Sequence, residues 1–450
     1  MNFENFNSLL AERKYSALVR ELYEINAVDA AEFLTVVSDE DLPKVFRMLK
    51  KSVAAEIFAE LDSDVQEKII HAFSDQEFSK ILDQLYIDDV MDMLDELPAS
   101  VVDRILKNAD SQTRAEINRF LKYEEESAGS VMTSEFVRIR SSMTVAEAVN
   151  YIRRVGAHKE TVYVIYVTDN SRVLEGIVEL RDLLFAKEDD LIDDIMDRSV
   201  ICALTTDHQE EVAMKIAKYD LLALPVVDSE GRLVGIVTVD DALDVIEEEA
   251  TEDIEIMSAI VPSDKPYLKT GIFETWKQRI PWLLLLMLSA TFTSAIITHY
   301  ENSLADAVIL TAFIPMLMGT GGNAGGQSSG TIIRSLSLGE VKMGNILKVL
   351  FKELRVSLIC GATLAIASFI KTLVLDFACD FSTENILVSL VVSLTLFATV
   401  IMAKLVGSSL PILAKRLGFD PAVMASPFIT TIVDAISLMI YFTIASAIIL

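Results

Sequence analysis

Cysteine and histidine are scarce in this chain of 450 residues. It has 3 Cys and 4 His, and Cys202, Cys360 and Cys379 lie far apart. An odd, widely spaced set of cysteines gives neither a disulfide framework nor the short spacings of a zinc site. The chain also lacks a nucleophile–base constellation, a G-x-x-x-x-G-K-[ST] phosphate-binding loop and a D-K-T-G-T motif. These absences argue against an enzyme and against ATP-driven transport.

Basic residues are also few, and their shortage is uneven. The chain has 39 Lys+Arg against 67 Asp+Glu, a net charge of −28, which argues against nucleic acid as a partner. Residues 1–275 carry a net charge of −30, whereas the remainder from Trp276 carries +2. The N-terminus, M-N-F-E-N-F-N-S, lacks the basic start and apolar run of a secretory signal, so we expect the acidic part in the cytosol.

Residues 1–127 are expected to form an all-α N domain of helical repeats. A-A-E-F-L-T-V-V at 30, A-A-E-I-F-A-E-L at 54 and V-M-D-M-L-D-E-L at 90 resemble one another, as in a small α-solenoid. One acidic helix carries Asp88, Asp89, Asp92 and Asp95. Three of these share a helix face and repel one another, so this face is either solvated or binds a cation.

Residues 128–250 change to a β/α pattern that occurs twice. V-M-T-S at 131 matches I-M-D-R at 195, and L-E-G-I-V-E-L-R-D-L-L at 174 matches L-V-G-I-V-T-V-D-D-A-L at 233. This part resembles a tandem pair of CBS domains with α/β fold. The resemblance implies that Thr238 and Asp241, in the G-I-V-T-x-x-D pattern, hold the phosphate and ribose of ATP or a similar nucleotide. Glu179 and Asp182 replace them in the first half, and a pair that only dimerises is the alternative.

The most acidic run, D-D-A-L-D-V-I-E-E-E-A-T-E-D-I-E, covers residues 240–255. Divalent cations would relieve its repulsion, and Mg²⁺ usually keeps several waters and takes one or two carboxylates per ion. Together with the earlier acidic face, it gives our candidate sensor residues for Mg²⁺, which are Asp88, Asp89, Asp92, Asp95, Asp241, Asp244, Glu248, Glu252 and Glu255. A connecting amphipathic helix is expected over residues 251–280.

Residues 281–450 are expected to form a transmembrane domain of five α-helices. Apolar segments at about 281–299, 307–333, 346–375, 386–413 and 422–449 can each cross roughly 30 Å of hydrocarbon. Loops 334–345 and 414–421 carry Lys and Arg, whereas loops 300–306 and 376–385 carry none. The positive-inside rule then predicts a multi-pass protein of the cell membrane, with cytoplasmic N-terminal domains and an external C-terminus.

The second apolar segment contains P-M-L-M-G-T-G-G-N-A-G-G-Q, with five glycines within eight positions. Glycine costs roughly 1 kcal/mol relative to alanine inside a helix, so this segment is not expected to be a plain membrane helix. A broken backbone that lines a watery pore is one interpretation, and tight helix packing through small residues is the other. The residues expected to line the pore, here and in the fifth segment, are Gly321, Gly322, Asn323, Gly325, Gln327, Ser426, Thr430 and Thr431.

Asp434 lies near the middle of the fifth segment, with no basic residue nearby in the sequence. A carboxylate inside the membrane is a functional-site candidate, and we interpret it as a cation ligand. The alternatives are a protonated, hydrogen-bonded carboxyl group and an ion pair with Lys404. Pro427 can kink this helix and free a carbonyl group.

Together these features resemble the MgtE family of magnesium channels over essentially the whole chain. The most specific parts are P-M-L-M-G-T-G-G-N-A-G-G-Q-S, L-G-F-D-P-A and S-P-F-I-T-T-I-V-D. The resemblance implies a homodimer in which Asp434 is the pore carboxylate near the two-fold axis. It also implies that Asp420 helps bind a cation at the cytoplasmic pore mouth, and it places Ser426 where the family often has Asn.

The resulting hypothesis is a channel through which Mg²⁺ enters the cytosol down its gradient. At high internal Mg²⁺, ions would bridge carboxylates of the soluble domains and hold the pore shut. At low Mg²⁺, repulsion within the acidic part would separate the domains and open it. Two other classes stay open at this point: a cation-coupled divalent-metal exchanger, and a CBS-containing membrane receptor whose helices only anchor it.

Overall fold

The computed structural model describes residues 3–263, 267–268, 270–300, 308–424 and 426–449. Inside its helices, the side chains of residues 95, 96, 108, 111, 112, 158 and 426 are outside the description. The chain divides into two compact units, Met1–Glu247 and Glu248–Leu450, and each is treated by itself. The predicted fold class of helical N domain, CBS pair and five-helix membrane domain is confirmed.

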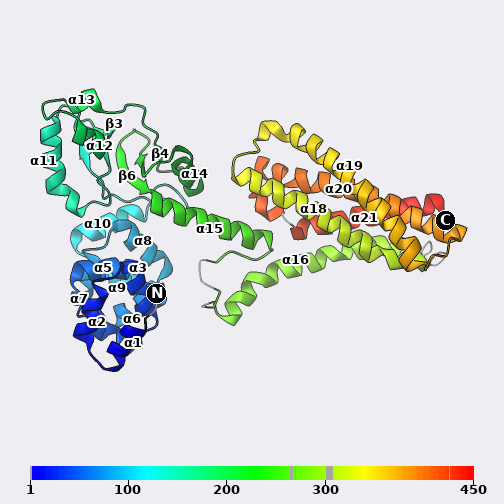
Figure 1. Cartoon of the computed structure of the whole chain (residues 1–450), viewed down its shortest axis with the longest axis horizontal. Helices are drawn as coiled ribbons and strands as arrows, with labels where there is room; N and C mark the ends of the chain where they lie inside the picture. Colours follow the sequence, from blue (N-terminus) through cyan, green and yellow to red (C-terminus); the bar gives the residue numbers. More distant parts are fainter. Residues whose placement is uncertain (1–2, 264–266, 269, 301–307, 425, 450) are drawn as a thin grey trace. The chain divides into compact units, whose positions relative to one another are not determined.

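The first unit begins with short helices (Figure 1), which pack around a shared core that includes the buried Phe33, Phe46 and Phe58. Helices of this length are marginal alone, so their stability comes from this packing. Ser74 and Glu77 form a capping box that fixes the start of one of them. The helices are α1 (Glu4–Ala11), α2 (Tyr15–Leu22), α3 (Ala27–Thr35), α4 (Leu42–Phe46), α5 (Lys51–Ala59), α6 (Ser63–Ala72), α7 (Asp75–Leu82), α8 (Ile87–Glu96), α9 (Ala99–Asn108) and α10 (Ser111–Phe120).

Two three-stranded sheets follow in the same unit, and they repeat one plan. The strands are β1 (Arg138–Ile139), β2 (Val164–Thr168), β3 (Leu174–Glu179), β4 (Ala203–Leu204), β5 (Ala223–Val227) and β6 (Leu233–Thr238). In each sheet the first pair is parallel and the second antiparallel. The accompanying helices are α11 (Val145–Val155), η1 (Gly156–His158), α12 (Leu180–Phe185), α13 (Ile192–Ile195) and α14 (Gln209–Tyr219). This repetition agrees with the tandem CBS pattern read from the sequence.

Helix α15 (Val239–Met257) begins directly after β6 and ends in the second unit. The single connecting helix expected over 251–280 is wrong, because α15 stops at Met257 and α16 starts only at Ile272. Ala259 adopts a positive φ of 56°, and the Glu255 carboxylate accepts a hydrogen bond from the backbone N–H of Ser263 at 3.0 Å. Both features turn the chain away from the helix axis.

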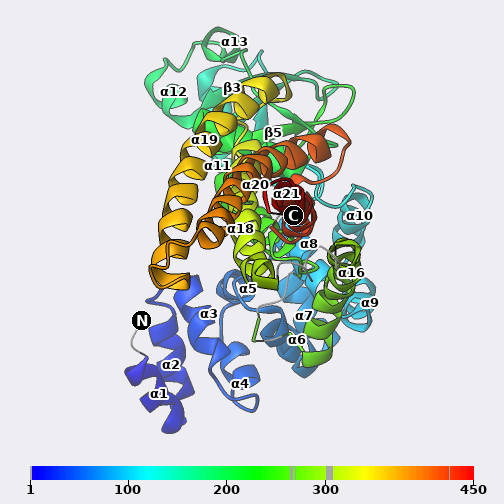
Figure 2. The same cartoon turned by 90° about the vertical axis from the view of Figure 1, so that its right-hand side faces the viewer.

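Five helices of the second unit are long and apolar enough to cross a membrane, within the part of the chain that the structure describes. They are α16 (Ile272–His299), α18 (Ile314–Ser337), α19 (Ile346–Lys371), α20 (Thr383–Arg416) and α21 (Ser426–Ile448). Short segments adjoin them, namely η2 (Val308–Phe313), η3 (Met343–Asn345), η4 (Thr372–Asp376) and η5 (Pro421–Met424). Figure 2 shows α18, α20 and α21 side by side, and their buried core includes Leu317, Val400 and Val433.

The glycine-rich segment is an unbroken α-helix, so the expected interruption of the backbone is wrong. A methyl group built at Gly321 would lie 2.7 Å from Cγ2 of Thr399, and one at Gly325 would lie 2.7 Å from Cγ2 of Ile429. These are closer than carbon atoms can approach, so the glycines allow α18 to press against α20 and α21. The alternative of tight helix packing through small residues is the one that the structure supports.

Candidate cation sites

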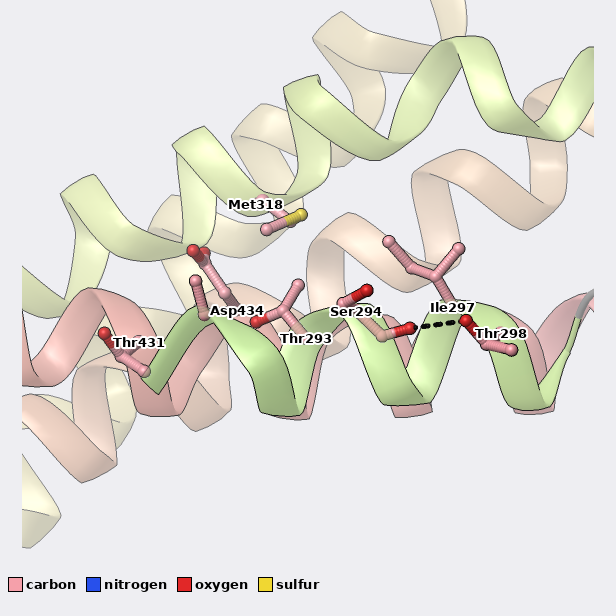
Figure 3. Close-up of a pocket in the computed structure, with 8 residues that line it drawn as sticks. Thr293, Ser294, Ile297, Thr298, Met318, Thr431 and Asp434 are labelled. Atoms are coloured by element: carbon pink, nitrogen blue, oxygen red, sulfur yellow. Dashed lines mark hydrogen bonds between the residues drawn. The ribbon is translucent and has the colours of Figure 1, made fainter. Parts of the chain in front are cut away.

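Asp434 lines a groove of about 360 Å³ in the membrane unit (Figure 3). The groove runs between α16 and α21, and Met318 of α18 faces it. Its lining is Ala290, Thr293, Ser294, Ile297, Thr298, Met318, Thr431 and Asp434. Hydroxyl groups beside one carboxylate offer oxygen atoms to a cation or to the water molecules around it, which is the chemistry that Mg²⁺ prefers.

The partners of Asp434 differ from those weighed in the sequence analysis. Lys404 does not pair with it, because the Lys404 ammonium group donates to Oγ of Ser328 at 3.4 Å. Among the described residues, Asp434 forms no ion pair within 4.0 Å and no hydrogen bond that would occupy its carboxylate. The carboxylate is therefore available to a cation that enters the groove.

Pro427 does not kink α21, because it is the second residue of that helix and so helps to start it. Its carbonyl oxygen accepts hydrogen bonds from the hydroxyl groups of Thr430 at 2.9 Å and Thr431 at 3.1 Å. Thr431 also lines the groove, whereas the Cγ2 atom of Thr430 lies against Gly322. The carbonyl expected to be free is thus occupied.

The expected pore-lining residues of α18 fall into two groups. Gly321, Gly322 and Gly325 are buried in the packing against α20 and α21 and not on an open face, which corrects the expectation for these three. Asn323 and Gln327 are exposed one turn apart on the same helix face. The side chain of Ser426 lies outside the described residues.

A second group of carboxylates, which we call the acidic cluster, lies inside the first unit. It consists of Asp88 and Asp89 from the first turn of α8, Glu160 from the loop before β2, and Asp241 from the first turn of α15. Asp88 is nine-tenths buried, and its Oδ1 and the Oε2 of Glu160 are buried without a hydrogen-bond partner among the described residues. None of the four forms an ion pair within 4.0 Å in the part of the chain that the structure describes.

Burial and mutual repulsion make this cluster avid for positive charge. Burial, reinforced by the charge of Asp89 and Asp241, raises the pKa of Asp88 well above its ordinary value. Burial is also the main cause that raises the pKa of Asp89 to about 6 and that of Glu160 to about 7. No three of these carboxylates bring oxygens within 4.8 Å of one another among the described residues, so the cluster suits an ion that retains part of its water.

The other candidate sensor residues are more dispersed. Asp92, Asp244 and Glu248 are exposed, and the side chain of Asp95 lies outside the described residues. Glu252 is half-buried, and Glu255 is engaged by the backbone of Ser263. Asp88 and Asp92, two of the three residues expected to share a helix face, therefore differ in environment, because Asp88 is buried and Asp92 is exposed.

Thr238 and Asp241, the two expected nucleotide contacts, are adjacent in the structure. The Thr238 hydroxyl donates to Oδ2 of Asp241 at 2.5 Å, and the Thr238 backbone N–H lies 3.3 Å from the same oxygen. This bonding fixes the Asp241 side chain at the start of α15. Asp241 belongs to the acidic cluster as well, so a nucleotide and a cation would meet at this residue.

A third acidic position lies at one end of the membrane unit. The hydroxyl group of Ser337, the last residue of α18, donates to Oδ2 of Asp253 at 3.1 Å. Ile256 and Met257 of α15 pack against Ile333 of α18. Burial and then the negative charge of Asp420 raise the pKa of Asp253, while the Ser337 hydrogen bond opposes them.

Sequence reasoning missed several of these residues. Glu160 is a single carboxylate in a loop, and nothing in its neighbourhood marks it. Asp253 lies in the acidic run 240–255, where nothing in the sequence distinguishes it from the other carboxylates. Thr293, Ser294 and Thr298 left a signal that could have been used, because hydroxyl residues cluster in T-F-T-S and I-T-H of an apolar helix.

A five-helix membrane unit with a carboxylate groove, joined to a CBS pair and an acidic helical domain, defines an integral membrane transport protein for cations. Comparison with known proteins specifies the family. The profile described as "Divalent cation transporter" (MgtE) matches residues 314–444, the MgtE intracellular N domain matches 25–126, and the CBS domain matches 128–189 and 192–248. The chain belongs to the MgtE family of divalent cation transporters.

Two magnesium transporters are similar to this chain over nearly their whole length. The chain is 37% identical to the magnesium transporter MgtE of Thermus thermophilus over 97% of this chain and 96% of that protein. It is 31% identical to the magnesium transporter MgtE of Bacillus subtilis over 98% and 95%. The solved cytosolic domain of an Mg²⁺ channel MgtE in complex with ATP has 39% identity and a TM-score of 0.50, and covers 53% of this chain and 98% of that one.

Proposed function

We propose that this protein is a homodimeric Mg²⁺ channel that admits Mg²⁺ to the cytosol down its gradient and closes when Mg²⁺ binds its acidic soluble domains. The observation that carries the proposal is the groove with Asp434, an unpaired carboxylate in an apolar helix. A charged side chain inside a membrane costs free energy, so its presence there indicates a functional site. The family membership and the magnesium transporters among the relatives support Mg²⁺ as the ion.

The lining of the groove fits an ion that is bound with its water. Mg²⁺ loses its hydration shell reluctantly, so a pore for it should present oxygen acceptors to a partly hydrated ion. The carboxylate of Asp434 supplies the charge, and Thr293, Ser294 and Thr431 supply hydroxyl oxygens for its waters. In the proposed dimer, the exposed Asn323 and Gln327 of α18 add amide groups from each copy.

Closure is assigned to two sets of carboxylates. In the acidic cluster, Mg²⁺ would bridge Asp88 and Asp89 of α8 to Asp241 and Glu160 of the CBS pair and remove their repulsion. At the end of α18, Mg²⁺ between Asp253 and Asp420 would hold α15 against the membrane helices, where Ile256 and Met257 already pack. Because Mg²⁺ binds the closed arrangement more tightly than the open one, internal Mg²⁺ shifts the population towards closure.

The CBS pair is proposed to bind ATP through Thr238 and Asp241. Support comes from the ATP complex of the similar cytosolic domain and from the hydrogen bond between these two side chains. The proposed orientation places the soluble domains in the cytosol and the C-terminus outside, as the distribution of Lys and Arg in the loops indicates.

The test is Mg²⁺ entry into liposomes that contain the purified full-length protein, with low and then high Mg²⁺ on the side of the soluble domains. Entry should be fast at low Mg²⁺, slow at high Mg²⁺ and absent in Asp434→Asn. The exposed carboxylate of Glu384, in the same unit, provides the control variant Glu384→Gln, which should behave as the wild type. Entry that requires a proton or Na⁺ gradient would indicate an exchanger, and no entry at all would indicate a receptor.

A further inference from the structure

Ser328 of α18 joins two groups of opposite charge from neighbouring helices, the buried Lys404 and the half-buried Glu353. Its hydroxyl group donates to Oε2 of Glu353 in α19 at 2.7 Å. The ammonium group of Lys404 in α20 donates to the same hydroxyl oxygen at 3.4 Å. Ser328 is 2% exposed and Lys404 is 7% exposed, so both lie inside the membrane unit.

The donors and acceptors available determine the direction of the two hydrogen bonds at Ser328. A lysine ammonium group has donors only, and a serine hydroxyl group has one proton and two acceptor lone pairs. Since Lys404 must donate to Ser328, the single proton of Ser328 goes to Glu353. Removal of Glu353 alone leaves the buried charge of Lys404 without compensation, which is more costly than replacement of both charged groups by neutral ones.

Within the part of the chain that the structure describes, Glu353 and Lys404 have no other charged partner. Among the described residues, neither forms an ion pair within 4.0 Å, and the Lys352 and Arg355 side chains beside Glu353 are exposed. Glu353 therefore differs from the basic residues beside it in α19, because its carboxylate faces Ser328 of α18. Lys404 is the cation that it reaches, through one hydroxyl group.

Two further contacts of α18 lie beside this network. Gly325 lies one turn before Ser328. A methyl group built on Gly325 would lie 3.3 Å from the carbonyl oxygen of Ala403. Ala403 directly precedes Lys404 in α20. One residue beyond Ser328, the hydroxyl group of Ser329 donates to the carbonyl oxygen of Met424 at 3.1 Å.

We propose that Lys404 and Glu353 form a charge pair across Ser328 that sets the position of α18 between α19 and α20. They are positioning residues: they do not touch the ion, but they hold the helix that presents Asn323 and Gln327. The glycines allow α18 to approach its neighbours, and the charge pair determines the depth at which it stops. The flux readout of this proposal rests on the proposed Mg²⁺ channel, whereas its stability readout does not.

The test is a double-mutant cycle on the full-length protein, with Lys404→Met, Glu353→Gln and both together. Each single variant should lower the thermal midpoint in detergent and reduce the initial rate of Mg²⁺ entry about tenfold, and the double variant should recover to within about twofold of the wild type. Lys404→Arg should retain most of the rate because it keeps the charge. The exposed lysine of the same region provides the control Lys352→Met, which should change neither readout.

Several outcomes would overturn the charge pair. Additive losses in the double variant, or a Lys404→Met variant as stable and active as the wild type, would show that the two charges are not coupled. If the single variants do not fold, a double variant that folds no better than they do has the same meaning. If the wild type carries no Mg²⁺, the proposed channel fails, and the thermal midpoints alone still decide whether the pair exists.

Discussion

Mg²⁺ binding at the acidic cluster should release protons, and the structure allows the amount to be worked out. With a pKa of about 7 for Glu160 and about 6 for Asp89, the metal-free unit holds about 0.6 proton on these two groups at pH 7. The corresponding amounts are about 1.4 protons at pH 6 and about 0.1 at pH 8. Because Mg²⁺ binds the ionised carboxylates, it displaces these protons.

The same displacement makes Mg²⁺ affinity depend on pH. Counting only Glu160 and Asp89, the apparent affinity of the cluster should fall about 20-fold between pH 8 and pH 6. In the metal-free unit, the stability contributed by these groups changes with pH in the direction opposite to that of an ordinary ion-paired carboxylate. The pKa of each group is higher in the folded unit than in the unfolded chain, so stability is lost as pH rises from about 4 to about 7.

The assay is isothermal titration calorimetry of the full-length protein in nanodiscs, in two buffers with different ionisation enthalpies. Counting the same two groups, Glu160→Gln should reduce the pH effect from about 20-fold to about twofold and should lower the proton release at pH 7 by about 0.5, because the contribution of Glu160 is lost and that of Asp89 remains. Asp189→Asn removes an exposed carboxylate of the same unit and should leave both quantities unchanged. Equal affinity at pH 6 and pH 8, or unchanged proton release in Glu160→Gln, would refute the reasoning.

Three further predictions concern other parts of the chain. Gly325→Ala should destabilise the membrane unit by about 1–3 kcal/mol in chemical denaturation, because its methyl group would meet Ile429, whereas Gly319→Ala, with no atom within 4 Å, should be nearly neutral. Asp253→Asn should leave Mg²⁺ entry into liposomes fast at high internal Mg²⁺, and normal closure would contradict the assignment of this residue to the gate. Thr238→Val should weaken ATP binding at least about tenfold in equilibrium dialysis, since it removes a buried hydrogen-bonding group, and Glu179→Gln in the first CBS half should have no effect.

The parts of the structure that local patterns specify could be read from the sequence. Repeated strand and turn motifs predicted the CBS pair, and hydropathy predicted the five helices. Asp434 was recognisable because a charge stands out within an apolar segment. These features depend on neighbours in the sequence, so a single chain is sufficient to predict them.

The remainder depends on contacts between distant segments. Glu160 lies near Asp88 and Asp241, which are 72 and 81 positions away in the sequence, and no local sequence pattern predicts this proximity. The glycines of α18 favoured the interpretation of a broken helix, which is wrong for a different reason. Helix propensities measured in water count the cost of Gly, but a membrane helix must satisfy its own backbone, and close packing on α20 and α21 outweighs that cost.

The packing of α18 has a mechanical consequence. Where two helices touch through bare backbone, there are no side chains that could change rotamer to absorb a displacement, so the contact behaves as a stiff joint. Gly325 of α18 and Gly407 of α20 make such a joint, because a methyl group built on Gly407 would overlap the carbonyl group of Gly325. In the proposed channel, opening is therefore expected to move α18 and α20 together, with the hinge in segments outside these two helices.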